Sequence, residues 1–484
     1  MLLNSLQLFS KSLNQTNNYK NQLIRFLSNK PKFAITINDD IDNQFEAGLK
    51  YRKHVGRRRV PIVSLPIRLE AAANTVIEKY NSQQFREDVK TMFRVIMDHK
   101  MPAEPNEMMA KKKEIRVRLM DKEAIDLKSM SPEERHEVLQ RIDIKVEKRL
   151  KDSLLNHLPI EYNEWKAAVY LAARLPPNFA SIYSVFKEIR AEIPDFVPKT
   201  LFDFGSGIGT TLWAANELWP KGFDEYFCVD INANMNELSR LLIQGGNENK
   251  KMIFDPVFYR QYLPVSHNIK YDLVVSAFSL LDIPDAKNRI HVIENLWHKT
   301  QDVLVIVEHG NRSGFAAVLE ARNLILQLSG HKITANFNYN PNNSQLSTVS
   351  QSTDATIISP CPHDLTCPRQ FTDGPVLCNF EITYNPLRYG QQKALTGRER
   401  YSYVVIRKTK EQTATKSWPR IVQPVLTGHH RAICRMCCSD GQIREVIATK
   451  SNHPKHAYKC AKQSDWGDKL PGLIYETQNN QNQD

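Results

Sequence analysis

Four residues of one short segment could hold a nucleotide-type ligand: Asp203, Gly205, Gly207 and Gly209. An apolar stretch precedes this segment, and a helix-like run, residues 210–218, follows it. Small residues in a turn between a strand and a helix let a ligand approach the backbone at the helix N-terminus. The spacing is D-x-G-x-G-x-G, which differs from the G-x-G-x-x-G of dinucleotide enzymes.

A second carboxylate lies about twenty residues beyond the turn, where dinucleotide folds place an acid that accepts hydrogen bonds from ribose hydroxyls. It is Asp230, at the end of a short apolar run, residues 227–231. The glycine turn resembles the first motif of class I S-adenosylmethionine (SAM) methyltransferases, and Asp230 supports that interpretation. The resemblance implies that the turn passes beneath the methionine half of SAM. A tight turn that binds no ligand is the alternative.

Cysteines form the second group that could do chemistry, because seven of the eight lie after residue 360. Where thiols are kept reduced, clustered cysteines are more often metal ligands than disulfides. Proline follows both Cys361 and Cys367, and gaps of five and ten residues separate Cys361, Cys367 and Cys378. These gaps exceed the roughly two to four residues of zinc knuckles. The wide spacing and the Cys-Pro pairs favour a loop around an iron–sulfur cluster.

Three cysteines need a fourth ligand, for which a second group offers candidates. These candidates are Cys434, Cys437 and Cys438. Spacing alone leaves two alternatives open: zinc held by Cys434 and Cys437 with two other residues, or small side chains that bind nothing.

A methyl-acceptor site is less evident than the cofactor turn. Enzymes that methylate exocyclic base amines often carry an Asn/Asp-Pro-Pro-aromatic tetrad after the fourth strand, but residues 276–280 read Ser-Ala-Phe-Ser-Leu. No cysteine nucleophile follows the fourth or fifth predicted strand. Glu308 and His309 form the only obvious acid–base pair, and an acid at a strand end can equally orient a loop.

The predicted elements around these motifs specify an α/β fold. Residues 271–276 and 303–308 are continuous apolar runs, as expected of parallel strands buried on both faces. Helical patterns cover residues 235–243, 286–297 and 314–328. The order predicts a doubly wound, Rossmann-like core of the class I SAM-methyltransferase type, which a strand at residues 401–406 completes.

Composition shifts and helix signals divide the chain into five parts. We expect a leader or disordered segment at residues 1–38, a helical domain at 39–195, and the methyltransferase-like domain at 196–410, with a metal-binding insertion at 336–400. A small cysteine-rich β module follows at 411–472, and a disordered tail at 473–484. Ser131 and Pro132 begin a helix. Two further helices, 161–175 and 181–193, should be separated by Pro176 and Pro177.

The distribution of charge predicts an anionic partner and targeting to mitochondria. The 484-residue chain carries a net charge of +12, and a pI near 9.1 suits a nucleic acid or an anionic membrane. The first 38 residues hold five Lys or Arg and no Asp or Glu, which is typical of a mitochondrial transit peptide; a merely disordered N-terminus is the alternative. No run of eighteen apolar residues predicts a membrane span.

Two basic clusters, residues 51–59 and 111–118, could contact RNA. For the second cluster, a solvated face is at least as good an explanation.

Four segments together resemble a mitochondrial family of ribosomal small-subunit methyltransferase-like proteins. The segments are residues 170–176, 203–215, 361–378, and 434–438 with 465–468. The C-P-H-D-x-x-C-P sequence, residues 361–368, is the most specific, because general methyltransferases lack it.

The resemblance implies a mitochondrial-matrix protein that binds the assembling small ribosomal subunit, its rRNA, its ribosomal proteins and its assembly factors, and so supports translation. It also implies a [4Fe-4S] cluster held by Cys361, Cys367, Cys378 and Cys437. Two functions remain: an assembly factor whose fold serves as an RNA-binding scaffold, which we favour, and an active SAM-dependent rRNA methyltransferase.

Overall fold

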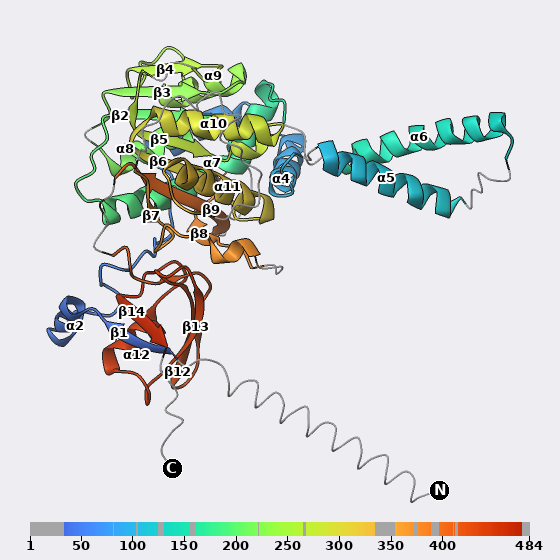
Figure 1. The fold of residues 1–484 in the computed structure, drawn as a ribbon. Coiled ribbons are helices and arrows are strands. Elements are labelled where there is room, and N and C mark those ends of the chain that lie inside the picture. Colours follow the sequence, from blue (N-terminus) through green and yellow to red (C-terminus); the bar gives the residue numbers. More distant parts are fainter. Residues whose placement is uncertain are drawn as a thin grey trace, which may run out of the picture.

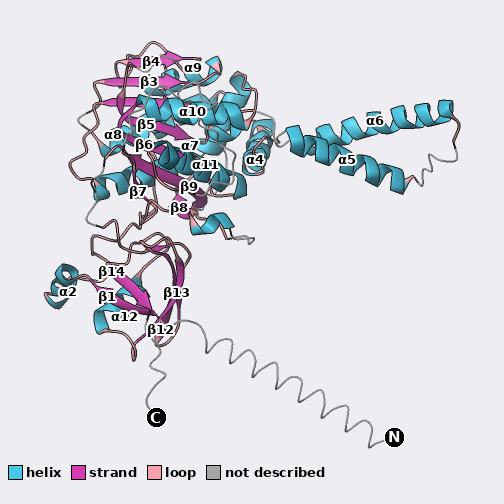
Figure 2. Cartoon of the chain, in the orientation of Figure 1, coloured by secondary structure: helices cyan, strands magenta, loops and turns pink. Residues whose placement is uncertain are grey.

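The computed structural model describes residues 33–476, apart from gaps within that range. The gaps are residues 81, 103–104, 124–129, 155–159, 221, 265–267, 334–353, 372–375, 389–395, 410 and 412–414. Most of the predicted leader and most of the Asn- and Ser-rich stretch before residue 356 lie outside the described residues. Three parts are visible: an α/β body, a smaller β module beneath it, and a two-helix arm that leaves the body sideways (Figures 1 and 2).

An eight-stranded sheet forms the centre of the body. Its strand order is β4-β3-β2-β5-β6-β9-β7, with β8 also paired to β9. Strands β4 to β6 are mutually parallel and β9 is antiparallel to β6. This is the strand order of class I SAM methyltransferases, so the predicted fold class is confirmed. The strands are β2 (Thr200–Phe204), β3 (Glu225–Val229), β4 (Val257–Arg260), β5 (Tyr271–Ala277), β6 (Thr300–His309), β7 (Thr356–Ser359), β8 (Phe380–Tyr384) and β9 (Gly397–Arg407).

Alternate side chains of the central strands enter two separate cores, one on each face of the sheet. Val275 of β5 belongs to the core that contains α3, α4, α7, α8 and α9, whereas Val274 belongs to the core with α10 and α11. Because both faces are covered, the strands read as unbroken apolar runs. The helices are α3 (Ile67–Glu78), α4 (Gln83–Met97), α7 (Glu164–Glu192), α8 (Thr210–Leu218), α9 (Ala233–Ile243), α10 (Ala286–Lys299) and α11 (Arg312–Leu328).

Helix α7 corrects one sequence prediction, because it runs unbroken through Pro176 and Pro177. Proline inside a helix removes a hydrogen bond and costs about 3 kcal/mol. Here the central part of the helix is buried nearly all round, against α4, α8, α9 and the strands β8 and β9. Tertiary burial of this many side chains outweighs the local penalty, which a single-sequence rule cannot anticipate.

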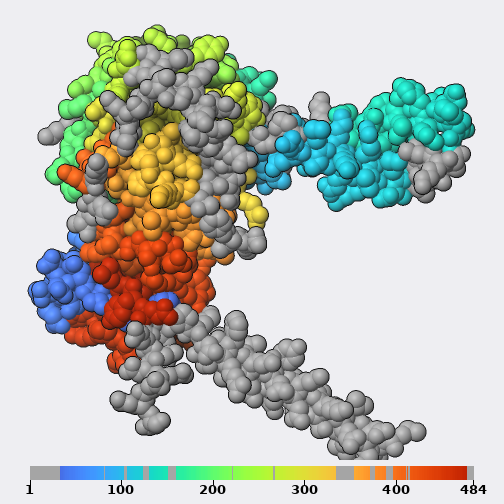
Figure 3. All heavy atoms as spheres, in the orientation of Figure 1, coloured from blue at the N-terminus to red at the C-terminus, as the bar shows by residue number. Residues whose placement is uncertain are grey.

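The region 39–195 is not a separate helical domain in the described structure. Helices α3, α4 and α7 share one hydrophobic core with the sheet. Helices α5 (Pro105–Lys122) and α6 (Pro132–Leu154) stand apart, as an arm with a small core of its own (Figure 3). The predicted start of α6 is confirmed, since Ser131 Oγ accepts from the Glu134 N–H at 3.3 Å and Glu134 accepts in return from the Ser131 N–H.

The C-terminal module draws on both ends of the chain. Strand β1 (Phe33–Ile37) pairs with β14 (Gly472–Glu476), and helix α2 (Asp39–Glu46) packs into the same core. The expected boundaries at residues 38 and 473 therefore need correction. A strand pairing across more than four hundred residues leaves no local sequence signal, because each strand looks like an isolated short apolar run. The other elements are β10 (Arg420–Ile421), β11 (Leu426–Thr427), β12 (Arg431–Cys437), β13 (Ile443–Thr449) and α12 (Lys455–Gln463).

Within the described residues, no helix has the length and apolar character that a bilayer crossing requires.

Candidate cofactor site and cysteine cluster

The glycine turn lies between β2 and α8, at the carboxyl edge of the sheet. Gly205, Gly207 and Gly209 all have left-handed φ angles, of 67°, 50° and 75°. A Cβ atom on Gly205 would lie 2.3 Å from Ser279 Cβ, and one on Gly209 would lie 2.3 Å from Ser239 Oγ. A Cβ on Gly207 would meet nothing closer than 3.6 Å. The outer glycines are therefore required by packing, whereas a Cβ on Gly207 would make only ordinary van der Waals contacts, with Met235 Cε and the Gly205 carbonyl oxygen.

Asp230 lies directly against this turn. Its Oδ2 accepts from the Gly207 N–H at 2.8 Å, and its Oδ1 accepts from the Asn232 N–H at 2.9 Å. Burial raises the pKa of the Asp230 carboxyl, and these two N–H donors oppose the shift. Burial likewise raises the pKa of Asp203 to about 8, against the influence of the Thr211 hydroxyl. The predicted turn and acid thus occupy one site.

Two exposed apolar residues beside Asp230 escaped the sequence analysis. Ile231 is 78% exposed and Tyr262 is 75% exposed. They follow β3 and β4, whose ends are adjacent, since the Asp230 N–H donates to the Arg260 carbonyl. Side chains this apolar and this exposed offer a surface that a purine ring could cover. The available signal was the position of Ile231 immediately after a strand-ending acid.

The segment before α7 covers another side of the site. The Tyr162 carbonyl accepts from the Asn232 and Asn234 side-chain amides at 2.8 and 3.0 Å. The pKa of the Tyr162 hydroxyl lies well above its ordinary range because the group is buried, with Tyr170, Asp282 and Asp230 adding to the shift. The site is therefore bounded by carboxylates and tyrosines.

Packed side chains fill the space at the ends of β5 and β6. Phe278 adopts a left-handed φ of 58°, and its ring centroid lies 4.7 Å from that of His309. Arg174 donates to Glu399 at 2.8 Å and lies 3.3 Å from His309 Nδ1. The side chains of Arg174 and Glu399 are at most 1% exposed. This ion pair and the two rings form a solid plug at the ends of β5 and β6.

Glu308 is committed to the same plug. Its Oε1 accepts from the Leu280 N–H at 2.8 Å, and the residue is fully buried. Burial raises the pKa of Glu308 to about 8, although the Leu280 N–H opposes the shift. The geometry is that of an acid orienting the loop after β5.

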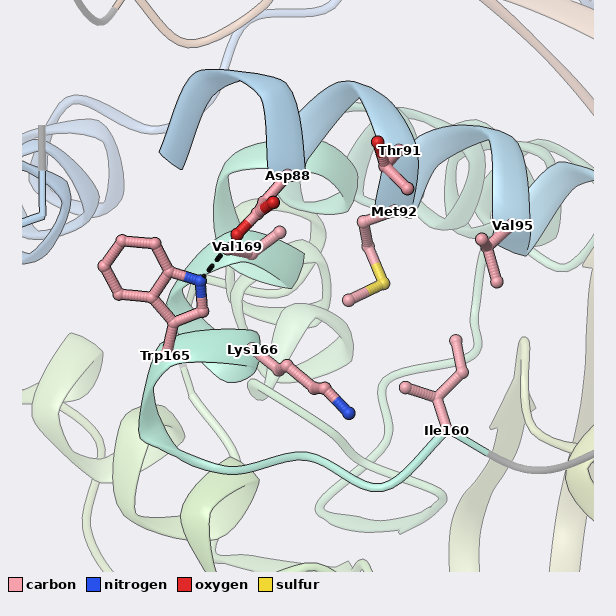
Figure 4. A pocket seen from close by; sticks show the side chains of 8 residues that line it. All are labelled: Asp88, Thr91, Met92, Val95, Ile160, Trp165, Lys166 and Val169. Atoms are coloured by element: carbon pink, nitrogen blue, oxygen red, sulfur yellow. Dashed lines mark hydrogen bonds between the residues drawn. The ribbon is translucent and has the colours of Figure 1, made fainter. Parts of the chain in front are cut away.

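A separate apolar cleft lies between α4 and the start of α7 (Figure 4). It has a volume of about 330 Å³ and includes Met92, Val95 and Ile160. Trp165 Nε1 donates to Asp88 Oδ2 at 2.9 Å across one end. None of the predicted site residues lines this cleft.

The cysteine site joins two parts of the fold. Cys361 and Cys367 follow β7, Cys378 precedes β8, and Cys437 ends β12 of the C-terminal module. The pKa of the Cys437 thiol lies well above its ordinary range because of burial and because the Cys361, Cys367 and Cys378 thiols lie close enough to repel a negative charge there. One contact places Cys437 beside the loop that carries Cys361 and Cys367, because His363 Nε2 lies 3.3 Å from Cys437 Sγ. Cys378 precedes β8, which pairs with β9 as β7 does.

Several contacts hold the loop that carries these cysteines. His363 Nε2 lies 3.3 Å from Cys437 Sγ. Arg322 of α11 donates to the His363 and Leu365 carbonyls at 3.2 and 2.7 Å. Lys416 donates to Asp364 Oδ1 at 2.9 Å. The loop is thus fixed to both the body and the module without any bond between cysteines.

The remaining C-terminal cysteines face elsewhere. Cys434 Sγ donates to the Ala461 carbonyl at 3.7 Å inside the module core. Cys460 Sγ lies 3.5 Å from His54 Nε2. Burial raises the pKa of Cys438 to about 11, and Arg444 opposes that shift. In the described part of the chain, no three His, Cys, Asp or Glu residues are grouped closely enough for one metal ion.

Residues 164–471 match the family described as "Mitochondrial small ribosomal subunit Rsm22". The human protein "Ribosome assembly protein METTL17, mitochondrial" is 34% identical over 423 residues, which cover 87% of this chain and 86% of that protein. The chain belongs to the Rsm22 family.

More distant members extend the comparison. "Ribosome assembly protein RSM22, mitochondrial" of Saccharomyces cerevisiae is 21% identical, with 68% of this chain and 70% of that protein covered. "Rsm22-cox11 tandem protein 2, mitochondrial" of Schizosaccharomyces pombe is 26% identical and covers 62% of this chain and 42% of its own length. The SAM-bound structure of magnesium protoporphyrin IX methyltransferase from Synechocystis overlaps 52% of this chain and 86% of that enzyme, at 12% identity and a TM-score of 0.28. The fold assignment rests on strand order, not on that overlap.

This Rsm22-family chain uses much of its first basic cluster internally. Arg57 pairs with Asp465 at 2.8 Å and with Asp468 at 2.5 Å. Arg58 pairs with Glu192 and is 5% exposed. The prediction that the cluster at residues 51–59 contacts RNA therefore needs correction at Arg57 and Arg58, because buried carboxylates already neutralise their charges.

A buried ionic clasp lies beside these pairs and connects the body of the Rsm22-family chain to its C-terminal module. Glu188 of α7 pairs with Arg420 of β10 and accepts from Ser359 Oγ and the Tyr403 hydroxyl, both at 2.6 Å. Glu192, one turn further along α7, pairs with Lys469 at 2.7 Å. Two acids on one helix therefore hold two cations of the module.

Proposed function

We propose that this protein is an assembly factor of the mitochondrial small ribosomal subunit, which acts in the matrix and supports mitochondrial translation. It binds small-subunit rRNA alongside ribosomal proteins and other assembly factors. Relatives in the same family are named as mitochondrial ribosome assembly proteins. The net charge of +12 suits a phosphate-rich partner.

The plug beside the cofactor turn is the observation that favours a scaffold over an enzyme. A general base must reach the proton it removes. Glu308 is fully buried and accepts a backbone N–H, and Arg174 and Glu399 neutralise each other next to His309. These residues serve to position loops, and none of them is directed at an acceptor.

The four cysteines support a [4Fe-4S] cluster held by Cys361, Cys367, Cys378 and Cys437. Four thiols without a carboxylate among them suit iron–sulfur chemistry. When bound, such a cluster would connect the body to the module through Cys437, so that metal binding would contribute directly to folding.

SAM binding at the glycine turn is supported by the left-handed glycines, the carboxylate of Asp230 and the exposed Ile231 and Tyr262. A Gly207→Val change should abolish calorimetric SAM binding, because its branched side chain would occupy the path that the cofactor takes past the turn. A valine at left-handed φ also costs roughly 1–2 kcal/mol.

Gly330→Val is the matched control, because Gly330 has a φ of 85° and nothing within 4 Å of its Cβ position. It should show similar backbone strain and bind SAM normally. No SAM binding by the unaltered protein would refute the cofactor proposal and leave the fold unchanged.

The scaffold proposal predicts that Glu308→Gln restores small-subunit assembly in cells depleted of the protein. The amide can still accept from the Leu280 N–H, and no proton transfer is required of it. Assembled subunits would be measured by gradient sedimentation beside cells that receive the unaltered chain. Failure to rescue, while the variant still joins the subunit and one rRNA methyl mark disappears, would favour the enzyme.

A further inference from the structure

A polar cleft of about 530 Å³ lies where the body meets the C-terminal module. Four stretches form most of its walls: residues 52–62, the strand β8, residues 424–427, and residues 462–467 at the end of α12 and just beyond it. Glu188 and Arg420 of the ionic clasp lie in its lining. The cleft is remote in the fold from the glycine turn, since it lies beyond the other end of the sheet order, at β8 and β9.

The cleft has a surplus of positive charge. Its lining includes five cations: Arg52, Arg58, Arg59, Arg420 and Lys462. It includes three acids, each of which already faces an arginine: Glu188 with Arg420, Glu381 with Arg400, and Asp465 with Arg57 and Arg59. Arg52 and Lys462 have no ion pair among the described residues. Lys462 Nζ donates to the His429 carbonyl and to the Tyr458 hydroxyl, both at 3.3 Å, but neither partner neutralises its charge.

Aromatic groups accompany these charges. Trp466 lines the cleft, and the Arg400 guanidinium lies 5.6 Å from its ring centroid. Within the described structure the Trp466 indole N–H is buried without a hydrogen-bond partner. Phe380 also lines the cleft, and the Arg420 guanidinium lies 4.9 Å from the centroid of its ring. Planar side chains beside cations provide the combination that stacks bases and neutralises phosphates in single-stranded nucleic acid.

We propose that this cleft binds a single-stranded RNA segment, with Arg52 and Lys462 on phosphates and Trp466 against a base. The inference rests on the proposed function, because it specifies where and in which form rRNA is bound. Duplex RNA fits less well, because its bases are stacked internally and do not reach a recessed indole. A peptide added along the β8 edge is the competing occupant.

The test is fluorescence anisotropy of the full-length protein with a labelled single-stranded oligoribonucleotide of about 12 nucleotides. Arg52→Gln with Lys462→Gln should weaken binding about tenfold, and it should reduce the slope of log K against log salt by about 1.4, or 0.7 for each lost phosphate contact. Trp466→Leu should weaken binding with little change in slope, because a stacked base carries no counterion.

The matched control is Lys148→Gln with Lys287→Gln, which removes two exposed cations, one from α6 and one from α10, outside both basic clusters. It should leave affinity and slope nearly unchanged. If both double variants lost RNA affinity equally, the cleft would not be the RNA site, although the protein would still be an RNA-binding protein. No binding of any RNA by the unaltered protein would refute RNA binding itself. If the Arg52→Gln, Lys462→Gln variant still bound RNA normally but no longer bound an extended peptide, the cleft would be a peptide site.

Discussion

Replacing Cys437 with serine should yield a protein that lacks the broad visible absorption of an iron–sulfur cluster and melts at least about 5 °C lower, because metal binding is coupled to folding. Cys437 is the one proposed ligand that the C-terminal module contributes. Losing it would remove the proposed metal-mediated connection between the module and the loop that carries Cys361 and Cys367, and leave contacts such as Lys416 with Asp364. Absorption spectra and thermal melts of anaerobically purified protein measure both effects.

The neighbouring Cys438→Ser change is the matched control. Cys438 is equally buried but is not one of the proposed ligands, and its Sγ lies 3.9 Å from the Met436 carbonyl oxygen. It should keep its visible spectrum and lose little stability. The same spectral loss in Cys438→Ser and none in Cys437→Ser would show that the fourth ligand is misassigned.

Breaking the ionic clasp should destabilise the fold by about 3–5 kcal/mol, the usual cost of leaving one partner of a buried ion pair unpaired. In Glu188→Met the Arg420 guanidinium would stay buried without its carboxylate, and the Ser359 and Tyr403 hydroxyls would lose their acceptor. Chemical denaturation of full-length protein measures the loss. Glu217→Met, which alters an exposed glutamate on α8, should change stability by no more than about 0.5 kcal/mol.

The double variant Glu188→Met with Arg420→Met separates charge burial from packing. Removing both charges abolishes the unpaired ion, so the double variant should be more stable than the sum of the single effects predicts. Simple additivity would show that the two residues act independently.

Acid should diminish the contribution of Glu188 in a defined range. Burial would raise the pKa of this carboxyl, but the Arg420 guanidinium holds it at about 2, below the ordinary 4.5. A lowered folded-state pKa stabilises the protein above the unfolded value and loses that effect as pH falls. The stability difference between the unaltered protein and Glu188→Met should therefore narrow between about pH 4.5 and 2. The pKa of Glu399 is also lowered to about 2, but both proteins contain this residue, so its effect on the stability difference cancels.

The sheet and the cofactor turn were predictable because their signals are local. Continuous apolar runs marked β5 and β6, and the glycine spacing placed Gly205, Gly207 and Gly209 before α8. Helix α7 was divided wrongly because the penalty of Pro176 and Pro177 is local, whereas the burial that overrides it is not.

Long-range partners could not be predicted from local patterns. Arg58 and Glu192, or the strands β1 and β14, meet only after the chain has folded. The basic cluster at residues 51–59 therefore looked like a nucleic-acid surface, while two of its arginines are structural.

The choice of Cys437 has a physical basis that the sequence pattern alone did not reveal. Successive residues of a strand face opposite sides. Cys434 and Met436 of β12 enter the module core, whereas Cys437 points to the other face, toward His363. Without knowing that residues 431–437 are a strand with one buried face, Cys434 and Cys437 are equivalent candidates.

We propose that Cys361, Cys367, Cys378 and Cys437 hold an iron–sulfur cluster within a methyltransferase-like fold. The most direct test counts iron, acid-labile sulfide and zinc in full-length protein purified without oxygen. We expect iron and sulfide in equal amounts that match one [4Fe-4S] cluster per chain, with zinc only in traces. Stoichiometric zinc without iron would contradict the account.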